Sequence, residues 1–134
     1  MLKIAQYAGL AIVFLFFLIG GISHFTNTEM FVSIMPPYVP FHLAVVYLTG
    51  VMEIAAAACI LFPVTRYWAG NFLFVFTIAV TPANVHMWLN PKLFPDIDPA
   101  FLSIRLLLQV VLLAVIWFST RIPHEPTVQP LTSS

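Results

Sequence analysis

Charged side chains are scarce in this sequence. Asp, Glu, Lys and Arg make up 7 % of its 134 residues, whereas a soluble domain carries about 25 %. Five acidic and five basic side chains are too few to cover a domain of this length, so its surface must face lipid. The net charge of zero excludes the basic field that nucleic acid binding requires, and we expect no nucleic acid partner.

Cysteine is also nearly absent. Cys59 stands alone inside an apolar run, which excludes a disulfide framework or a Cys-x-x-Cys pair within the chain. We interpret it as a small apolar helix residue. The sequence also lacks a phosphate-binding loop, a nucleophile elbow and a catalytic triad. It therefore predicts no catalytic residues and leaves enzyme status undecided, with the balance against catalysis by this chain alone.

Hydrophobic residues are abundant, at 61 % of the chain. A transmembrane helix needs about 20 mostly apolar residues, and four segments meet this requirement, at about 4–22, 43–62, 67–88 and 101–118. We predict an all-α, four-helix transmembrane bundle that forms one membrane domain over residues 1–121. The Pro-containing tail, 122–134, is expected to be disordered.

The four spans leave two long connections that contain prolines, 23–42 and 89–100, and one tight turn at 63–66. The part of the first connection between Met30 and Pro40 is too apolar for a solvated loop. We expect it to lie in the membrane interface or to fold back over the mouth of the bundle.

Basic residues predict the orientation. Lys3, Arg66 and Arg121 fall on one side of the predicted membrane, and Lys92 falls on the other. Because cytoplasmic loops carry the excess of Lys and Arg, both termini should be cytoplasmic and the long loops should face outward. The expected location is a cell membrane, crossed several times, of the bacterial inner-membrane type.

Glu53 lies in the middle of the second span, where an ionisable group is costly unless it faces the bundle. Its neighbours three and four residues away on the helix are all small: Thr49, Gly50, Ala56 and Ala57. A neighbouring helix can approach closely on such a face. Glu53 is therefore predicted to point into the bundle.

The third span carries a polar stripe whose spacing of four, three and four residues puts it on one helix face: Thr77, Thr81, Asn84 and Trp88. Pro82 lies within this stripe. It removes the hydrogen bond to the carbonyl of Ile78 and bends the helix. A carbonyl freed at this depth needs a partner or a cavity.

Six polar residues are expected together in the outer half of the bundle, as ligand-binding or polar-core candidates: His24, Glu53, Asn84, His86, Arg105 and Gln109. Glu53 either pairs with Arg105, if that side chain reaches down, or is protonated, because burial disfavours its charged form. Two interpretations stay open: a network that fixes helix register, or a cavity that opens outward for a small ligand, a quinone or a proton path. Two histidines without a cysteine or a spaced carboxylate predict no metal site.

The order of these elements resembles the DoxX-type family of membrane proteins. The resemblance covers about residues 9–121. Its most specific elements are Gly50–Glu53, within Tyr47-Leu-Thr-Gly-Val-Met-Glu-Ile54, and Pro82–His86, within Ala79-Val-Thr-Pro-Ala-Asn-Val-His-Met87. Weaker pieces are Gly21-Ile-Ser-His-Phe25, Ser33-Ile-Met-Pro-Pro-Tyr-Val-Pro40, Pro63-Val-Thr-Arg66, Arg105 and Gln109. It implies a four-helix membrane bundle. The family's named member is a subunit of a thiosulfate:quinone oxidoreductase, and no family-wide catalytic residues transfer.

These observations favour an accessory membrane subunit, or a binder of a small ligand such as a quinone or a lipid, in a redox-linked system. No cofactor is evident from the sequence; under this hypothesis a quinone is the possible cofactor. Its partners would be the lipid bilayer and either a membrane or redox protein or further copies of the chain. The alternative is a membrane scaffold or assembly factor without ligand, motivated by the small-residue face of the second span. A proton-coupled carrier, motivated by Glu53 alone, ranks below both.

Overall fold

The computed structural model describes residues 1–123, and every regular element in that range is a helix. The elements are α1 (Leu2–Thr26), α2 (Thr28–Ser33), α3 (His42–Ile60), α4 (Pro63–Ala79), α5 (Thr81–Leu89), the short 3₁₀ helix η1 (Pro91–Leu93) and α6 (Pro99–Ser119). The predicted all-α class is confirmed. The tail predicted to be disordered lies outside the described residues, except for Ile122 and Pro123.

Four helical segments are long and apolar enough to cross a membrane: α1, α3, α4 with α5, and α6. The shortest, α3, has 19 residues and spans about 28 Å, close to the roughly 30 Å hydrocarbon core of a bilayer. Several helices begin or end beyond the predicted spans, because amphipathic residues such as His24 and His42 continue the helix past the apolar core.

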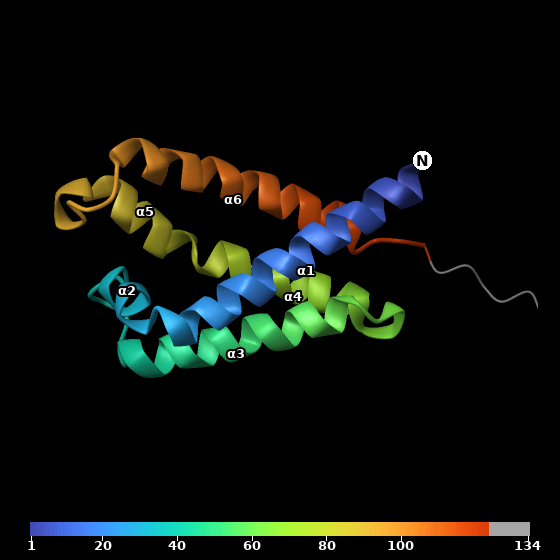
Figure 1. The fold of residues 1–134 in the computed structure, drawn as a ribbon, viewed down its shortest axis with the longest axis horizontal. Coiled ribbons are helices and arrows are strands. Elements are labelled where there is room, and N and C mark those ends of the chain that lie inside the picture. Colours follow the sequence, from blue (N-terminus) through green and yellow to red (C-terminus); the bar gives the residue numbers. More distant parts are fainter. Residues whose placement is uncertain (124–134) are drawn as a thin grey trace, which may run out of the picture.

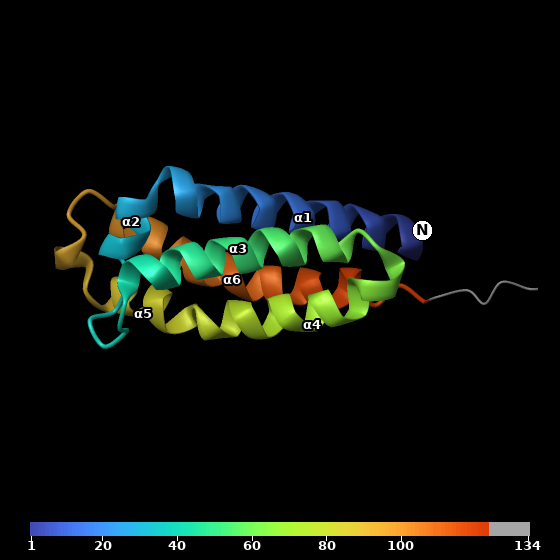
Figure 2. The ribbon, with the colours of Figure 1, turned by 90° about the horizontal axis from the view of Figure 1, so that it is seen from below.

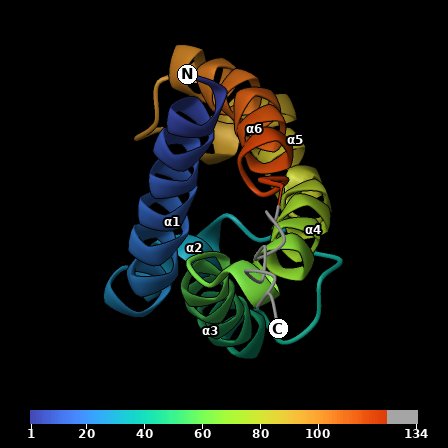
Figure 3. The same ribbon diagram turned by 90° about the vertical axis from the view of Figure 1, so that its right-hand side faces the viewer.

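The helices run along the long axis of an elongated bundle (Figures 1 and 2). Seen from one end, they form a ring in which α1 packs against α3 and α6, and α4 packs against α3 and α6 (Figure 3). The N-terminus, the α3–α4 turn and the end of α6 share one end of the bundle, here called the terminal end. The opposite end, with α2 and η1, is called the loop end.

Prolines define several helix boundaries. Pro63 and Pro99 occupy the first turns of α4 and α6, where a missing N–H costs nothing. Asp98 caps α6 by accepting a hydrogen bond from the Ala100 N–H at 2.9 Å, which stabilises the helix start. The predicted disruption at Pro82 divides the third span at Val80 into α4 and α5.

The apolar core lies towards the terminal end and the middle of the bundle. It is built by Leu10, Val13, Phe17, Ala56, Ala57, Ile60, Ala69, Leu73, Phe76 and Ile116. Large apolar side chains such as Ile12, Val75 and Leu107 are more than half exposed and form the surface that lipid would cover. The loop half of the bundle contains few of these core residues; Val46, Met87 and Leu102 are buried there, and polar contacts between the helices add to them.

The loop after α1 folds back on the bundle. Helix α2 packs against α3 and α1, and Phe31 stacks on the His24 ring with centroids 4.1 Å apart. Pro36 is buried as well. This segment therefore covers the end of the α1–α3 pair and shields His24.

Candidate functional site

Close packing of α1 against α3 positions the first pair of polar residues. A Cβ built on Gly50 would lie 2.7 Å from the His24 Cβ and 3.1 Å from the Gly21 carbonyl oxygen. A Cβ on Gly21 would lie 2.9 Å from the Gly50 carbonyl oxygen. Only glycine permits this approach, so these two residues set the helix separation that brings His24 to Glu53.

His24 and Glu53 form a buried pair. The His24 Nε2 lies 3.4 Å from the Glu53 Oε1, with both side chains about one-tenth exposed. On the other side of the ring, Nδ1 lies 2.8 Å from the Val46 carbonyl oxygen, which can only accept, so Nδ1 carries a proton. The Thr49 hydroxyl packs at 3.2 Å from the same nitrogen.

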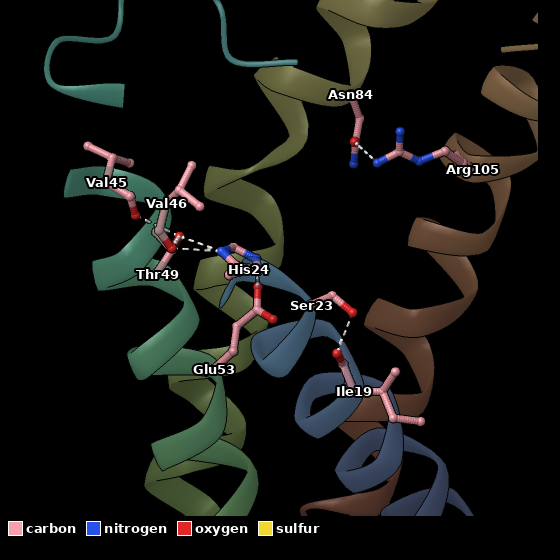
Figure 4. Close-up of polar contacts among 9 residues, drawn as sticks. All are labelled: Ile19, Ser23, His24, Val45, Val46, Thr49, Glu53, Asn84 and Arg105. Atoms are coloured by element: carbon pink, nitrogen blue, oxygen red, sulfur yellow. Dashed lines mark hydrogen bonds and ion pairs between the residues drawn. The ribbon is translucent and has the colours of Figure 1, made fainter. Parts of the chain in front are cut away.

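One proton must therefore lie between Nε2 and the carboxyl group. Either the ring is doubly protonated and Glu53 is ionised, or the ring is neutral and Glu53 is protonated. The pair carries no net charge in both arrangements. A neutral pair avoids most of the cost of a charge at this depth in a bilayer, and Figure 4 shows the two side chains turned towards each other.

A second cluster joins α5 to α6. The Arg105 Nη2 donates to the Asn84 Oδ1 at 2.9 Å, and the Asn84 Nδ2 donates to the Gln109 Oε1 at 2.6 Å. Gln109 then donates to the Thr81 hydroxyl and, at 3.3 Å, to the Thr77 carbonyl oxygen. The Gln109 amide and, at 3.0 Å, the Thr81 hydroxyl thus both bond to the Thr77 carbonyl oxygen beside the break between α4 and α5. This carbonyl precedes that of Ile78, which Pro82 was predicted to free.

The polar stripe predicted for the third span lies along this contact. Besides Thr81 and Asn84, the Trp88 indole donates to the Ser103 hydroxyl at 3.1 Å. All three side chains bond to α6. These three residues of the stripe form a polar seam between α5 and α6, whereas the Thr77 hydroxyl donates to the Leu73 carbonyl oxygen within α4 at 2.7 Å.

Arg105 lacks a counter-ion in this seam. Its two hydrogen bonds go to the Asn84 amide oxygen and, at 3.2 Å, to the Met87 sulfur. No carboxylate of the described residues lies within ion-pair distance of it, and three of its five N–H donors have no partner in residues 1–123. The residue is half-buried, about 9 Å along the axis from the start of α6.

The six predicted residues therefore separate into three groups. Glu53 pairs with His24, Arg105 binds Asn84 in the same network as Gln109, and Figure 4 shows these two groups apart. The Glu53–Arg105 ion pair considered above does not form. His86 belongs to neither group: it lies in the last turn of α5, its carbonyl oxygen accepts from Asn90 at 2.9 Å, and its ring lies edge-on to Phe94.

The sequence predicts no site at the terminal end. Arg66 and Arg121 serve there only as orientation signals, yet they line a pocket of about 520 Å³. The distribution of charged residues along the sequence did contain a signal for this pocket. Three of the five basic residues gather at this end, whereas the acidic residues of the described part lie elsewhere: Glu29, Glu53, Asp96 and Asp98. Within residues 1–123, no group of three or more His, Cys, Asp or Glu side chains is placed to hold a metal ion.

Fold and site together define a helical membrane protein, with four membrane-length segments and two polar clusters in one half of the bundle. The chain belongs to the family defined by a domain of unknown function, DUF8561, whose model matches residues 10–120. No curated protein and no solved structure matches it.

Proposed function

We propose that this protein binds a lipid-soluble molecule whose head carries hydrogen-bond acceptors, of the quinone or lipid type, at Arg105. The observation that carries the proposal is the state of that guanidinium. It bonds only to neutral acceptors and keeps three N–H donors without a partner in residues 1–123. At hydrocarbon depth in a bilayer no water satisfies such donors, and a polar group left without a partner there costs several kcal/mol.

The chemistry of the ligand follows from these surroundings. Carbonyl or phosphate oxygens would accept from Arg105, whose planar fork suits paired acceptors. The exposed apolar side chains of α6 around it, Phe101, Ile104 and Leu108, would contact the apolar part of such a molecule. A polar head with a hydrocarbon body, reaching the site from the bilayer, meets both requirements.

The biological setting follows from the family resemblance and the distribution of basic residues. The DoxX-type resemblance supports an accessory role in a redox-linked membrane system, with a membrane or redox protein or a second copy of the chain as partner. The charge asymmetry of Lys3, Arg66 and Arg121 against Lys92 supports a cytoplasmic terminal end in a bacterial inner membrane.

The alternatives lose their motivating features. The small-residue face suggested for a scaffold is used within the chain, where Gly50 contacts His24 and Gly21, so it is not free for a partner. The carboxylate suggested for a proton-coupled carrier is paired with His24. Neither alternative is favoured by a contact in the described residues.

The test is ligand content. Full-length protein purified in mild detergent would be analysed by native mass spectrometry and, after organic extraction, for quinones and lipids. We expect a bound molecule in the wild type and at least a ten-fold lower occupancy in Arg105→Ala, because each charge-assisted hydrogen bond contributes about 1.5–3 kcal/mol.

Lys92→Ala is the matched control, since it removes one cation at the loop end from an exposed position. It should retain the ligand. Glu53→Gln tests how far the binding site extends. If this variant retains the ligand, the ligand's polar head contacts Arg105 alone; if it loses the ligand, the head also contacts the His24–Glu53 pair. Equal ligand content in the wild type and Arg105→Ala would refute the proposal.

A further inference from the structure

Three basic residues that are far apart in sequence line one pocket at the terminal end. Lys3 comes from α1, Arg66 from α4 and Arg121 from the segment after α6, and the pocket between them has a volume of about 520 Å³. No acidic side chain of the described residues lines it. The pocket lies at the opposite end of the bundle from Arg105, and two guanidinium groups face it.

Arg66 is held rigidly in this pocket. Its Nε donates to the Ile60 carbonyl oxygen at 2.8 Å and its Nη2 donates to the Leu61 carbonyl oxygen at 3.1 Å. These carbonyls end α3, where a cation interacts favourably with the helix dipole. Both acceptors are neutral, so the charge of this buried residue is oriented without being cancelled.

Arg121 is fixed in a similar way. Its guanidinium lies 3.6 Å from the centroid of the Trp117 ring, donates to the Asn71 Oδ1 at 2.5 Å and donates to the Thr120 hydroxyl at 3.2 Å. These partners are also neutral. Two guanidinium groups thus stand pre-oriented at one pocket, which lowers the entropy lost when an anion binds.

The aromatic residues around the pocket indicate its depth. Tyr7 and Tyr67 line it, and Trp68 and Trp117 are exposed nearby on α4 and α6. Tyr and Trp gather at the level of the lipid headgroups. The pocket would therefore open where phospholipid phosphates lie.

We propose that this pocket binds the phosphate of an anionic phospholipid. Arginine forks match phosphate geometry, and basic pockets between transmembrane helices take anionic headgroups. The volume lies within the roughly 300–1,000 Å³ of small-ligand sites. A zwitterionic lipid would bring its own cation next to Lys3 and the two arginines, so it would bind less well.

The test compares two lipids on the full-length protein. Native mass spectrometry in detergent would follow titration with dioleoyl phosphatidylglycerol and with dioleoyl phosphatidylcholine. We expect preferential binding of the glycerol lipid by the wild type, weakened about five-fold by Arg121→Gln and by Lys3→Gln, which corresponds to about 1 kcal/mol per basic side chain near anionic lipid. Lys92→Gln, which removes the same charge at the loop end, should bind like the wild type.

Three outcomes would overturn the proposal. These are equal binding of the two lipids by the wild type, an effect of Lys92→Gln as large as that of Arg121→Gln, and displacement of the lipid by soluble glycerol phosphate. The third would assign the pocket to free phosphate compounds. The comparison of lipids on the wild type remains decisive if a variant does not fold.

Discussion

The contact between Gly21 and Gly50 gives the sharpest prediction about stability. In Gly50→Ala the new methyl group would lie 2.7 Å from the His24 Cβ, 3.0 Å from the Phe25 ring and 3.1 Å from the Gly21 carbonyl oxygen. The His24 Cβ is bonded directly to the backbone and the Gly21 oxygen is part of it, so no side-chain rotation can relieve these two overlaps. Helices α1 and α3 must move apart.

The size of the effect follows from two opposing terms. Overpacking of a close contact costs up to about 3 kcal/mol, and replacing glycine by alanine within a helix gains about 1 kcal/mol. We therefore expect Gly50→Ala to lower the free energy of unfolding by about 2 kcal/mol. It should also weaken the His24–Glu53 pair, which depends on this helix separation.

Gly9→Ala is the matched control. Its methyl group would lie 3.1 Å from the Ser119 Cβ and 3.4 Å from the Val115 Cγ1, so α6 needs to move only by a few tenths of an ångström, less than α1 and α3 must move in Gly50→Ala. The helix-propensity gain of about 1 kcal/mol should offset this cost, and the variant should unfold within about 0.5 kcal/mol of the wild type.

Thermal and denaturant unfolding in one mild detergent would measure these differences. The double variant Gly21→Ala/Gly50→Ala adds a further check, because the two methyl groups press on the same contact. Once the first has separated the helices, the second meets more space, so the combined loss should be smaller than the sum of the single losses. A Gly50→Ala protein as stable as Gly9→Ala, or strict additivity in the double variant, would contradict the reasoning.

Three further predictions concern the polar clusters and the orientation. His24→Phe should destabilise the protein by about 3–5 kcal/mol in unfolding assays, because it leaves the Glu53 carboxyl buried without its partner; Glu53→Gln, which keeps the shape of the side chain and a hydrogen-bonding group, should cost clearly less, and the reverse order would be evidence against the shared proton. Asn84→Leu should cost about 1–3 kcal/mol of unfolding free energy by leaving donors and acceptors on α6 unpaired. Trp88→Phe, which removes an exposed hydrogen bond, should cost less than about 1 kcal/mol. Similar losses in the two variants would mean that the Arg105–Asn84–Gln109 network is not the main support of the α5–α6 seam. In a background without Cys59, a cysteine replacing Asp96 should react with a membrane-impermeant thiol reagent in intact cells, and one added at either terminus should not; the opposite labelling would invert the proposed orientation.

The four membrane-length helices could be predicted because each one is encoded in a single continuous stretch of sequence. A stretch of apolar residues of bilayer length makes a helix regardless of its partners, since the membrane leaves the backbone no other way to satisfy its hydrogen bonds. The break near Pro82 follows from the chemistry of one residue, and the polar seam of α5 follows from helical periodicity. The inward direction of Glu53 was likewise encoded in its small neighbours, as its burial shows.

The partner of each polar side chain was decided only by the tertiary structure. His24, Asn84 and Arg105 all lie towards the loop end, so depth alone leaves Glu53 with more than one candidate. The choice depends on how each helix is rotated and how closely it approaches its neighbour. The glycine contact turns His24 towards Glu53, while Arg105 is engaged by Asn84 across another helix pair.

The same distinction explains the terminal pocket. The sequence by itself determined that three basic residues share one side of the membrane, because their order along the chain follows the alternation of the spans. That Lys3, Arg66 and Arg121 converge on one pocket required the ring of helices to close. Hydropathy and helical period act within a segment, whereas a site assembled from three segments is created by their packing.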